Sequence, residues 1–245
     1  MPDWVRQALA KGWKILTDYP KKQARFLTEP TKFIAGLEFG TWETKKDAFE
    51  VLVLGGTIAL VLHKNNVHLY DERIRRVIEI QDKAVNTVYL LAAVAAFAFL
   101  SFVPFRILGG RGTFVANGMT LMYAVGFTVP VATLLFVVMT RLESAMLDAA
   151  IVLIPPLKIA QFSNPDASGF SKFVLGAEAA IRLLWNIYFS VLLWLALCAA
   201  NQINRLRGIV ALIAAVALLF SLGGWLGRLV EMVVKPLRPL LEWIL

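Results

Sequence analysis

Residues 114–140 read FVANGMTLMYAVGFTVPVATLLFVVMT, and this stretch decides the fold of the chain. It carries no charged side chain, and it is longer than the ~20 apolar residues that a helix needs to cross a bilayer. Further apolar runs lie at Val85–Phe105, Leu183–Ala200 and Ile209–Val234. The sequence therefore predicts an integral membrane protein.

The composition agrees with this prediction. Hydrophobic residues make up 58% of the 245 positions, and the mean hydropathy is +0.67. A soluble domain is only about 45–50% apolar. A bilayer offers no hydrogen-bond partners to an open sheet edge, so the runs form helices or the strands of a closed barrel. Barrel strands are short segments of alternating polarity, whereas these runs are long and continuous, so we expect an all-α polytopic helical membrane bundle.

The chain has a formal net charge of +8. In a membrane protein, basic residues flank the spans, where they set the topology and contact anionic lipid headgroups. We therefore expect membrane lipids, including anionic headgroups, as partners, together with a protein partner or a second copy of the chain, and no nucleic acid. The one cysteine, Cys198, lies inside an apolar run and is expected to be a packing residue.

Amphipathic segments are expected at both ends of the bundle. Residues 1–47 form an interfacial head, because Trp13 and Leu16 recur on one helical face while Lys14 points elsewhere. The head holds nine Lys and Arg residues and no apolar core of a signal peptide, so we expect the N-terminus to stay in the cytoplasm. Residues 235–245 form an interfacial tail.

About five spans are expected in the bundle, which covers residues 48–234. They lie near 48–62, 86–105, 117–139, 180–200 and 209–230. The segment 145–157 is short for a crossing, carries Asp148 and stops at a proline pair, which favours a half-inserted or interfacial position. Five and six crossings both remain open on the sequence alone. A glycine pair in the first span, Gly55-Gly56, allows close helix contact.

No catalytic motif is present. The sequence lacks a G-x-S-x-G elbow, a Walker A loop, an H-E-x-x-H pair and a C-x-x-C pair. The run Gly109–Gly112 lacks the Lys-Ser/Thr of a phosphate loop and is expected to be a turn. His63 and His68 are five residues apart and do not share a helical face, which argues against a metal site. We therefore expect a non-enzymatic protein without catalytic, cofactor-binding or metal-binding residues.

Four polar residues are candidates for an intramembrane ion path: Asp148, Glu178, Arg182 and Asn186. Ionisable groups inside a membrane are costly and often functional, and a carboxylate in a broken half-helix is a feature of transporters. The structural alternative is that Glu178 and Arg182 form an i,i+4 pair near the interface and that Asp148 is solvated or paired. Asn186 would then hydrogen-bond a neighbouring helix, like the other asparagine residues of the apolar runs.

The segment 71–83 is the best candidate for binding a partner. Its charges are mixed, its apolar residues repeat at helical spacing, and that apolar stripe needs a cover. The candidate contact residues are Arg73, Arg75, Arg76 and Glu79. A solvated helix that packs on its own bundle is the alternative.

Three stretches resemble the Yip1 family of polytopic membrane proteins. Residues 122–130 (MYAVGFTVP) are similar to the third span of its bacterial members. Residues 184–197 (LWNIYFSVLLWLAL) are similar to the fourth span, which a polar turn with a basic residue follows. Residues 26–33 (FLTEPTKF) are similar to the P-x-x-F segment before the first span. The resemblance implies a five-helix membrane protein without recognised catalysis, and a bacterial member would lie in the inner membrane.

Two features depart from that family. The segment 63–83 is longer and more charged than the usual link between the first two spans. The Asp-Leu-Tyr-Gly-Pro motif of eukaryotic members is absent. Their partnership with small GTPases is therefore not carried over to this chain.

The sequence as a whole favours an organiser, assembly factor or accessory subunit that works through helix–helix and lipid contacts. The alternative is a small-solute or ion transporter, or a lipid-handling protein such as a scramblase. Transport predicts that Asp148 and Glu178 face one another inside the bundle. The organiser hypothesis predicts a tightly packed interior and an exposed apolar or small-residue seam for a partner.

Overall fold

The secondary structure is helical throughout the parts of the chain that the computed structural model describes, which are residues 3–67, 81–153, 169–222 and 228. These parts contain helices and turns and no strand, which confirms the predicted all-α class. The helices are α1 (Asp3–Thr28), α2 (Pro30–Ala35), α3 (Trp42–Val67), α5 (Gln81–Ile107), α6 (Phe114–Leu153), α8 (Gly169–Asn201) and a further helix at Arg205–Leu222.

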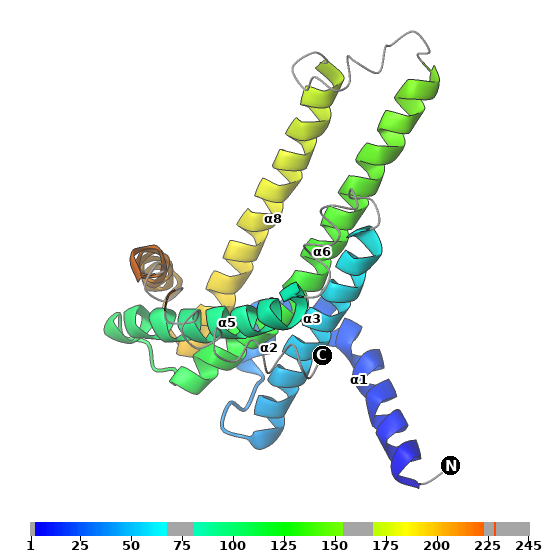
Figure 1. Ribbon diagram of the computed structural model, residues 1–245. Coiled ribbons are helices and arrows are strands. Elements are labelled where there is room, and N and C mark those ends of the chain that lie inside the picture. The colour runs from blue at the N-terminus through cyan, green and yellow to red at the C-terminus, as the bar shows by residue number, and fades with distance from the viewer. Residues whose placement is uncertain (1–2, 68–80, 154–168, 223–227, 229–245) are drawn as a thin grey trace.

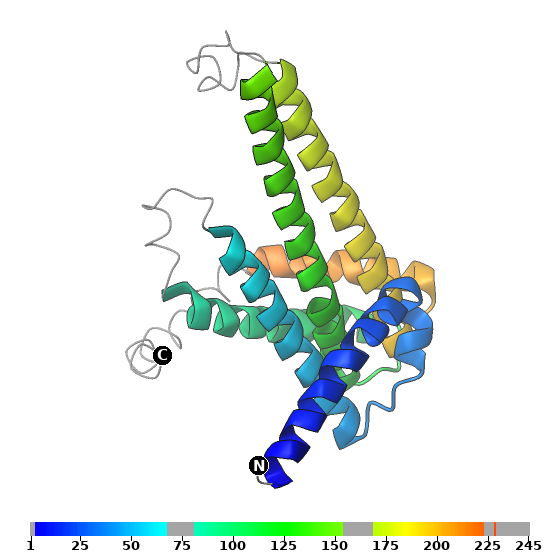
Figure 2. The same ribbon diagram turned by 90° about the vertical axis from the view of Figure 1, so that its right-hand side faces the viewer.

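α6 and α8 form a long antiparallel pair that rises from the rest of the molecule (Figures 1 and 2). α3 packs against the lower part of α6, and α1 and α2 pack at the base of the pair, where they contact α6 and α8. α5 and the helix Arg205–Leu222 lie across the pair instead of along it. Most contacts between helices therefore gather around the lower half of α6.

Three helices among the described residues are long and apolar enough to cross a membrane: Phe114–Met139, Leu183–Asn201 and Arg205–Leu222. They correspond to three of the five expected spans. Of the other two, 86–105 overlaps a shorter apolar stretch of α5, and 48–62 lies within α3, which is not among the three. The structure therefore supports a membrane protein with three candidate spans, and the count of five remains a prediction.

α6 is one continuous helix of 40 residues, which is about 60 Å long. The segment expected at 145–157 is not separate from the span before it, because residues 145–153 continue α6. Residues 140–153 contain neither proline nor glycine, and charged side chains alone do not interrupt a helix. Residues 154–157 lie outside the described part of the chain.

The expected interfacial head divides into two parts. In the first half of α1, Trp13 and Leu16 are 71% and 52% exposed, which leaves an apolar face open. The end of α1 and the whole of α2 instead pack into the protein, where Phe26 and Ile34 are fully buried. The head therefore belongs to the folded core as well as to the surface. The tail at 235–245 lies outside the described residues.

Buried amide groups join α5, α6 and α8. Asn117 of α6 donates hydrogen bonds to the backbone oxygen of Ala98 (3.0 Å) and to Oγ of Ser101 (2.7 Å), both in α5. Asn201 at the end of α8 donates to Oδ1 of Asn117 (3.0 Å). The three polar side chains are buried, so each would be costly without its partners. These two asparagines form the bonds between helices that the sequence suggested.

α3 and α6 approach each other closely because glycine faces glycine. Gly55 lies against the backbone of Gly126, and a Cβ added to Gly55 would lie 1.9 Å from the Gly126 oxygen. A Cβ added to Gly126 would lie 2.7 Å from the oxygen of Val51. Small residues let helix backbones approach in this way, so the contact depends on both glycines. A Cβ added to Gly56, by contrast, would have no described atom within 4 Å.

Gly55→Ala should lower the stability of the fold, because the new methyl group would meet backbone atoms instead of a movable side chain. We expect a loss of about 1–3 kcal/mol, measured by thermal unfolding of the detergent-solubilised protein. Gly56→Ala is the matched control, since it adds the same methyl group one residue away in open space and improves helix propensity by about 1 kcal/mol. Equal melting temperatures for the two variants would contradict the close contact between α3 and α6.

Candidate functional site

The candidate site lies where α1, α3 and α6 meet, and it is built around a proline in α6. Pro130 has no N–H, so the carbonyl oxygen of Gly126, four residues earlier, loses its donor within the helix. The hydroxyl of Tyr19 donates to this oxygen at 2.6 Å. One turn further along α1, Nε2 of Gln23 donates to the oxygen of Phe127 at 2.7 Å. α1 therefore supplies two donors at the point where the proline interrupts α6.

The Tyr19 phenol is held in its donating form. Burial raises the pKa of this group above its ordinary value, which is about 10. Because the pKa is raised in the folded state, the group contributes stability that is fully present below the ordinary pKa. That stability is lost only as the pH rises through the folded-state pKa.

Five aromatic rings from three helices surround these hydrogen bonds. They are Tyr19 and Phe26 of α1, Phe33 of α2, and Tyr123 and Phe127 of α6. The ring of Phe127 pairs with each of the other four, at centroid distances of 5.4, 5.4, 5.9 and 5.8 Å. Tilted, edge-to-face and offset pairs of this kind add stability beyond the burial of area. Packing and hydrogen bonds thus fix α1 and α2 to the same part of α6.

Asp47, in the second turn of α3, links the same group of helices by charge. Its Oδ1 forms an ion pair with Nζ of Lys22 on α1. Its Oδ2 accepts a hydrogen bond from the hydroxyl of Tyr123 on α6 at 2.7 Å. The side chains of Lys22 and Asp47 remain partly exposed, so solvent screens the pair, and its contribution to stability is about 1 kcal/mol or less. The carboxylate therefore orients the three helices more than it stabilises them.

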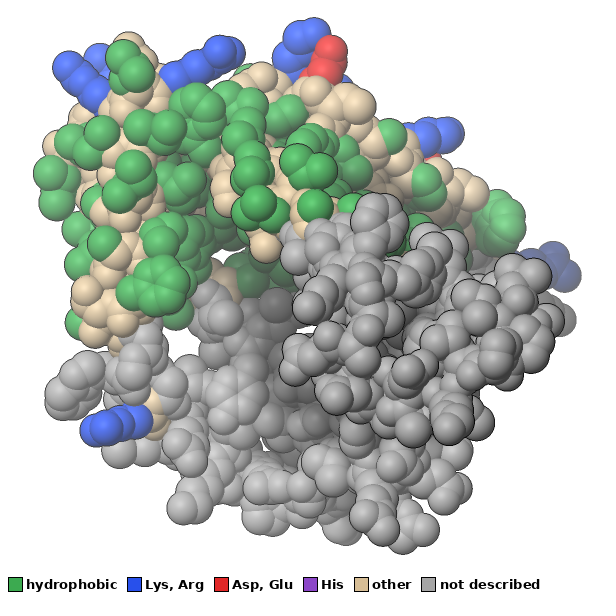
Figure 3. All heavy atoms as spheres, turned by 90° about the horizontal axis from the view of Figure 1, so that it is seen from above, with side chains coloured by type: hydrophobic (Ala, Val, Ile, Leu, Met, Phe, Trp, Pro, Cys, Tyr) green, Lys and Arg blue, Asp and Glu red, His purple; other side chains and the backbone are tan. Residues whose placement is uncertain are grey.

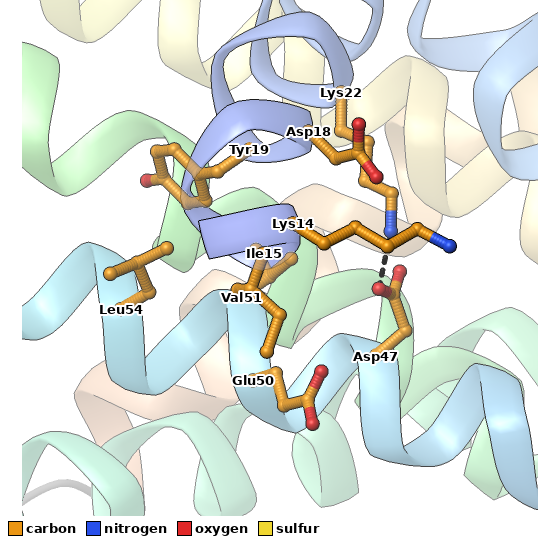
Figure 4. A pocket seen from close by; sticks show the side chains of 9 residues that line it. All are labelled: Lys14, Ile15, Asp18, Tyr19, Lys22, Asp47, Glu50, Val51 and Leu54. Atoms are coloured by element: carbon orange, nitrogen blue, oxygen red, sulfur yellow. Dashed lines mark hydrogen bonds and ion pairs between the residues drawn. The ribbon is translucent and has the colours of Figure 1, made fainter. Parts of the chain in front are cut away.

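A pocket of about 330 Å³ opens between α1 and α3 beside this carboxylate (Figure 4). Its charged lining consists of Lys14, Asp18 and Lys22 of α1 and Asp47 and Glu50 of α3. The rest of the lining is Ile15, Tyr19, Val51 and Leu54. In Figure 4 the charged ends of Lys14, Lys22 and Asp47 lie on one side of the pocket, whereas the Tyr19 hydroxyl points to the other side.

The pocket offers two ammonium groups and three carboxylates beside an apolar surface. Its volume is at the low end of the range for small-molecule sites. A lining of this kind suits a small ligand, or an adjoining segment of protein, that carries both charges. Within the described ranges, no three His, Cys, Asp or Glu side chains are placed to hold a metal ion.

The ionisable residues of the predicted ion path lie away from this pocket. Asp148 is on α6, and Glu178 and Arg182 are on α8, but their side chains lie outside what the structure describes. The hydrogen bond between Asn117 and Asn201 sets the antiparallel register of the two helices. In that register residue 178 is level with residue 140, so Asp148 lies eight residues, or about 12 Å, further along the pair.

The remaining predicted site residues have different outcomes. Asn186 is exposed on α8 and does not bond to a neighbouring helix within the described part of the chain. The candidate partner-binding residues Arg73, Arg75, Arg76 and Glu79 all lie outside the described residues. Their role remains a prediction.

Sequence reasoning did not find Tyr19, Gln23 or Asp47 as site residues. A signal was present in Pro130, because a proline inside an apolar run implies a carbonyl that needs a donor from elsewhere. Tyr19 and Gln23 are also four residues apart, which places them on one face of a helix. The sequence pattern does not identify the donor for this carbonyl oxygen, because the donor depends on where α1 packs.

Comparison with protein-family models, with curated proteins and with solved structures gives no match to this chain. The resemblance to the Yip1 family therefore remains a prediction.

Tyr19→Phe removes only a hydroxyl, and we expect it to cost about 1–3 kcal/mol of unfolding free energy, because the oxygen of Gly126 is left without a donor. The same change in a Pro130→Ala background should cost much less, because alanine at this position restores the helical N–H. Denaturant unfolding of the wild type, both single variants and the double variant measures this coupling. Equal costs in the two backgrounds would show that Tyr19 does not serve the proline break.

Asp47→Asn should loosen α1, because it removes the ion pair with Lys22 and weakens the bond to Tyr123. Limited proteolysis at the basic residues of α1 reports how often this helix detaches, and we expect cleavage up to about fivefold faster. Glu50→Gln is the matched control, because it lines the same pocket and makes only a longer contact with Lys46, at 3.9 Å. Identical cleavage rates for the two variants would rule out the proposed role of Asp47.

Proposed function

We propose that this chain is a non-enzymatic integral membrane protein that acts as an organiser, assembly factor or accessory subunit of a membrane complex. It works through helix–helix contacts and through contacts with lipid. The observation that carries this proposal is a row of polar side chains on an exposed face of α8.

The row is centred on Asn186 and Ser190, which lie four residues apart within the candidate span Leu183–Asn201 and are both exposed. Neither side chain has a hydrogen-bond partner in the part of the chain that the structure describes. An amide or hydroxyl that faces hydrocarbon cannot bond to water, so it favours a partner helix. Glu178 and Arg182 continue the same spacing towards the start of α8, along one ridge of the helix.

Apolar side chains beside this row provide contact area. Leu183, Ile187 and Val191 are exposed on α8 next to the polar row. The helix Arg205–Leu222 adds a second apolar surface, since its buried residues are small and most of its larger ones are exposed. Figure 3 shows hydrophobic side chains over the described part of one face, with Lys and Arg near its margin. Such surfaces fit lipid and a partner helix.

We place the protein in the bacterial inner (cytoplasmic) membrane, with its N-terminus in the cytoplasm and with about five spans. The hydrogen bonds from Tyr123 to Asp47 and from Asn201 to Asn117 bring the starts of α3 and α6 and the end of α8 to one end of the molecule. Basic side chains gather there: Lys45, Lys46, Arg106, Arg111, Arg205 and Arg207. An excess of basic residues is typical of the cytoplasmic side, which supports this orientation.

A small-solute or ion transporter, or a scramblase, is the second candidate. The same polar row on α8 favours it, because polar side chains on a membrane helix can line a path between two copies of the chain. The two candidates differ in what the row contacts. An organiser holds a partner helix against it, whereas a transporter keeps it open to a solute or to lipid headgroups.

Photo-crosslinking in the native membrane separates these cases. A photoreactive amino acid at position 186 should give an adduct of defined mass with a second copy or with another protein. The same amino acid at position 138, which is exposed on the candidate span Phe114–Met139, is the control for contact with lipid. Asn186→Leu should weaken retention of the partner about threefold, which is the average effect of one hydrogen bond between membrane helices.

Two results would count against the organiser. One is an adduct with lipid alone from position 186. The other is a solute or lipid flux in liposomes that contain only the purified protein, if Asn186→Leu abolishes that flux. The second result would replace the organiser with the transport alternative.

A further inference from the structure

Two short turns at one end of the molecule carry four arginines. Arg106 and Arg111 flank the turn between α5 and α6, and Arg205 and Arg207 begin the helix that follows α8. All four are exposed. The sequence has no Asp or Glu from residue 83 to 142, or from 179 to 230, so no acidic residue lies near them along the chain.

The two turns are in direct contact. The backbone N–H of Arg111 donates to the oxygen of Asn201 at 2.8 Å. A Cβ added to Gly112 would lie 2.6 Å from the oxygen of Ala200, so only glycine permits this approach. Gly109, with a φ of +93°, turns the chain back on itself. The glycine-rich run that looked like a simple turn therefore brings two basic segments together.

Two of the guanidinium groups lie beside neighbouring glycines of one turn. Nη1 of Arg106 donates to the oxygen of Gly110 at 3.1 Å. Nη1 of Arg207 lies beside Gly109, 3.7 Å from the position that a Cβ would occupy there. Arg106 and Arg207, which are far apart in the sequence, thus place their charges over one short turn.

No acidic side chain in the described part of the chain balances this charge. None of the four arginines forms an ion pair with a described residue. Arg205 and Arg207 also lie in the first turn of their helix, where Asn204 accepts a hydrogen bond from the backbone N–H of Leu206 at 3.0 Å. The start of a helix is the positive end of its dipole, so it repels the two arginines there. An anion would relieve that repulsion.

The position of the turns indicates the source of that anion. The candidate span Phe114–Met139 begins at one turn, Leu183–Asn201 ends at the other, and Arg205–Leu222 begins there. These segments are 18 to 26 residues long, about the length that crosses a bilayer, so a crossing places their ends near the lipid headgroups. Guanidinium groups bind phosphate through paired hydrogen bonds.

We infer that Arg106, Arg111, Arg205 and Arg207 form a binding site for the phosphate of an anionic lipid headgroup, here called the arginine site. The inference rests on the membrane location in the proposed function, but it requires no protein partner. Free phosphate has the same chemistry, so the experiment must distinguish the two sources.

The test is a lipid titration of the full-length protein, purified in a mild neutral detergent, with native mass spectrometry as the readout. The probes are phosphatidylglycerol, which is anionic, and phosphatidylcholine, which is zwitterionic. The wild type should retain more phosphatidylglycerol than phosphatidylcholine. Arg106→Gln with Arg207→Gln should lower the affinity for phosphatidylglycerol about thirtyfold, since each basic residue near an anionic surface contributes about fivefold.

Lys21→Gln with Arg25→Gln is the matched control, because it removes two exposed positive charges from α1 and leaves the arginine site intact. Arg111→Gln with Arg205→Gln is a second test pair. The side chains of these two arginines make no hydrogen bond to a described residue, so this pair keeps the proposal testable if loss of the Arg106 contact disturbs folding. Both test pairs should reduce the preference, and the control pair should not.

Two outcomes would overturn the arginine site: equal retention of the two lipids by the wild type, or equal losses in the control and test pairs. A competition experiment separates the two sources of phosphate. If millimolar inorganic phosphate displaces the lipid and chloride at the same ionic strength does not, the site belongs to free phosphate and the lipid source is overturned.

Membrane integration is measured separately, as the resistance of the liposome-reconstituted protein to carbonate extraction. An integrated protein without lipid preference would sink this inference alone, whereas a protein that is not integrated would sink the proposed function.

Discussion

The free carbonyl that Pro130 leaves in α6 is the constraint on which the rest of the structure depends. A carbonyl buried in an apolar bundle needs a donor, and α1 supplies one by lying against α6 at the level of the break. This position brings Tyr19 onto the ring of Phe127 and places Lys22 beside Asp47. The residue whose oxygen is freed is a glycine, which also lets α3 approach from another side. One gap in the hydrogen-bond ladder of α6 therefore lies where both α1 and α3 pack.

The sequence predicted what depends on length and composition, and it missed what depends on docking. Apolar runs longer than a bilayer is thick predicted the all-α class, and three expected spans coincide with long apolar helices. The short apolar segment with Asp148 predicted a separate element at 145–157, but residues 145–153 continue α6, where neither proline nor glycine follows residue 140. Amphipathic spacing in the head did not reveal that Phe26 faces protein instead of lipid. The bonds from Tyr19 and Gln23 join positions more than 100 residues apart, which no local pattern can specify.

Polar side chains in the described part of the chain fall into two groups with different uses. The buried side chains of Asn117 and Asn201 are hydrogen-bonded, and the backbone oxygen that Pro130 leaves without a helical donor is bonded as well. These polar groups therefore serve folding. Asn186 and the four arginines of the two turns are exposed and have no charged or helical partner among the described residues. Because unmet polar groups are costly next to hydrocarbon, the second group indicates where other molecules contact the protein. The proposals for a partner helix and for a lipid headgroup both follow from that difference.

The length of α6 determines how deep its residues can lie. From Phe114 to Asp148 the helix advances 34 residues, which is about 51 Å, and about 39 Å along the membrane normal even at a tilt of 40°. The hydrocarbon layer is only about 30 Å thick. With Phe114 at one headgroup layer, the backbone of residue 148 therefore lies beyond the hydrocarbon on the opposite side. The end of α6 then forms a stalk whose height above the hydrocarbon is set by the number of residues in the helix, and the role of Asp148 in an ion path remains a prediction.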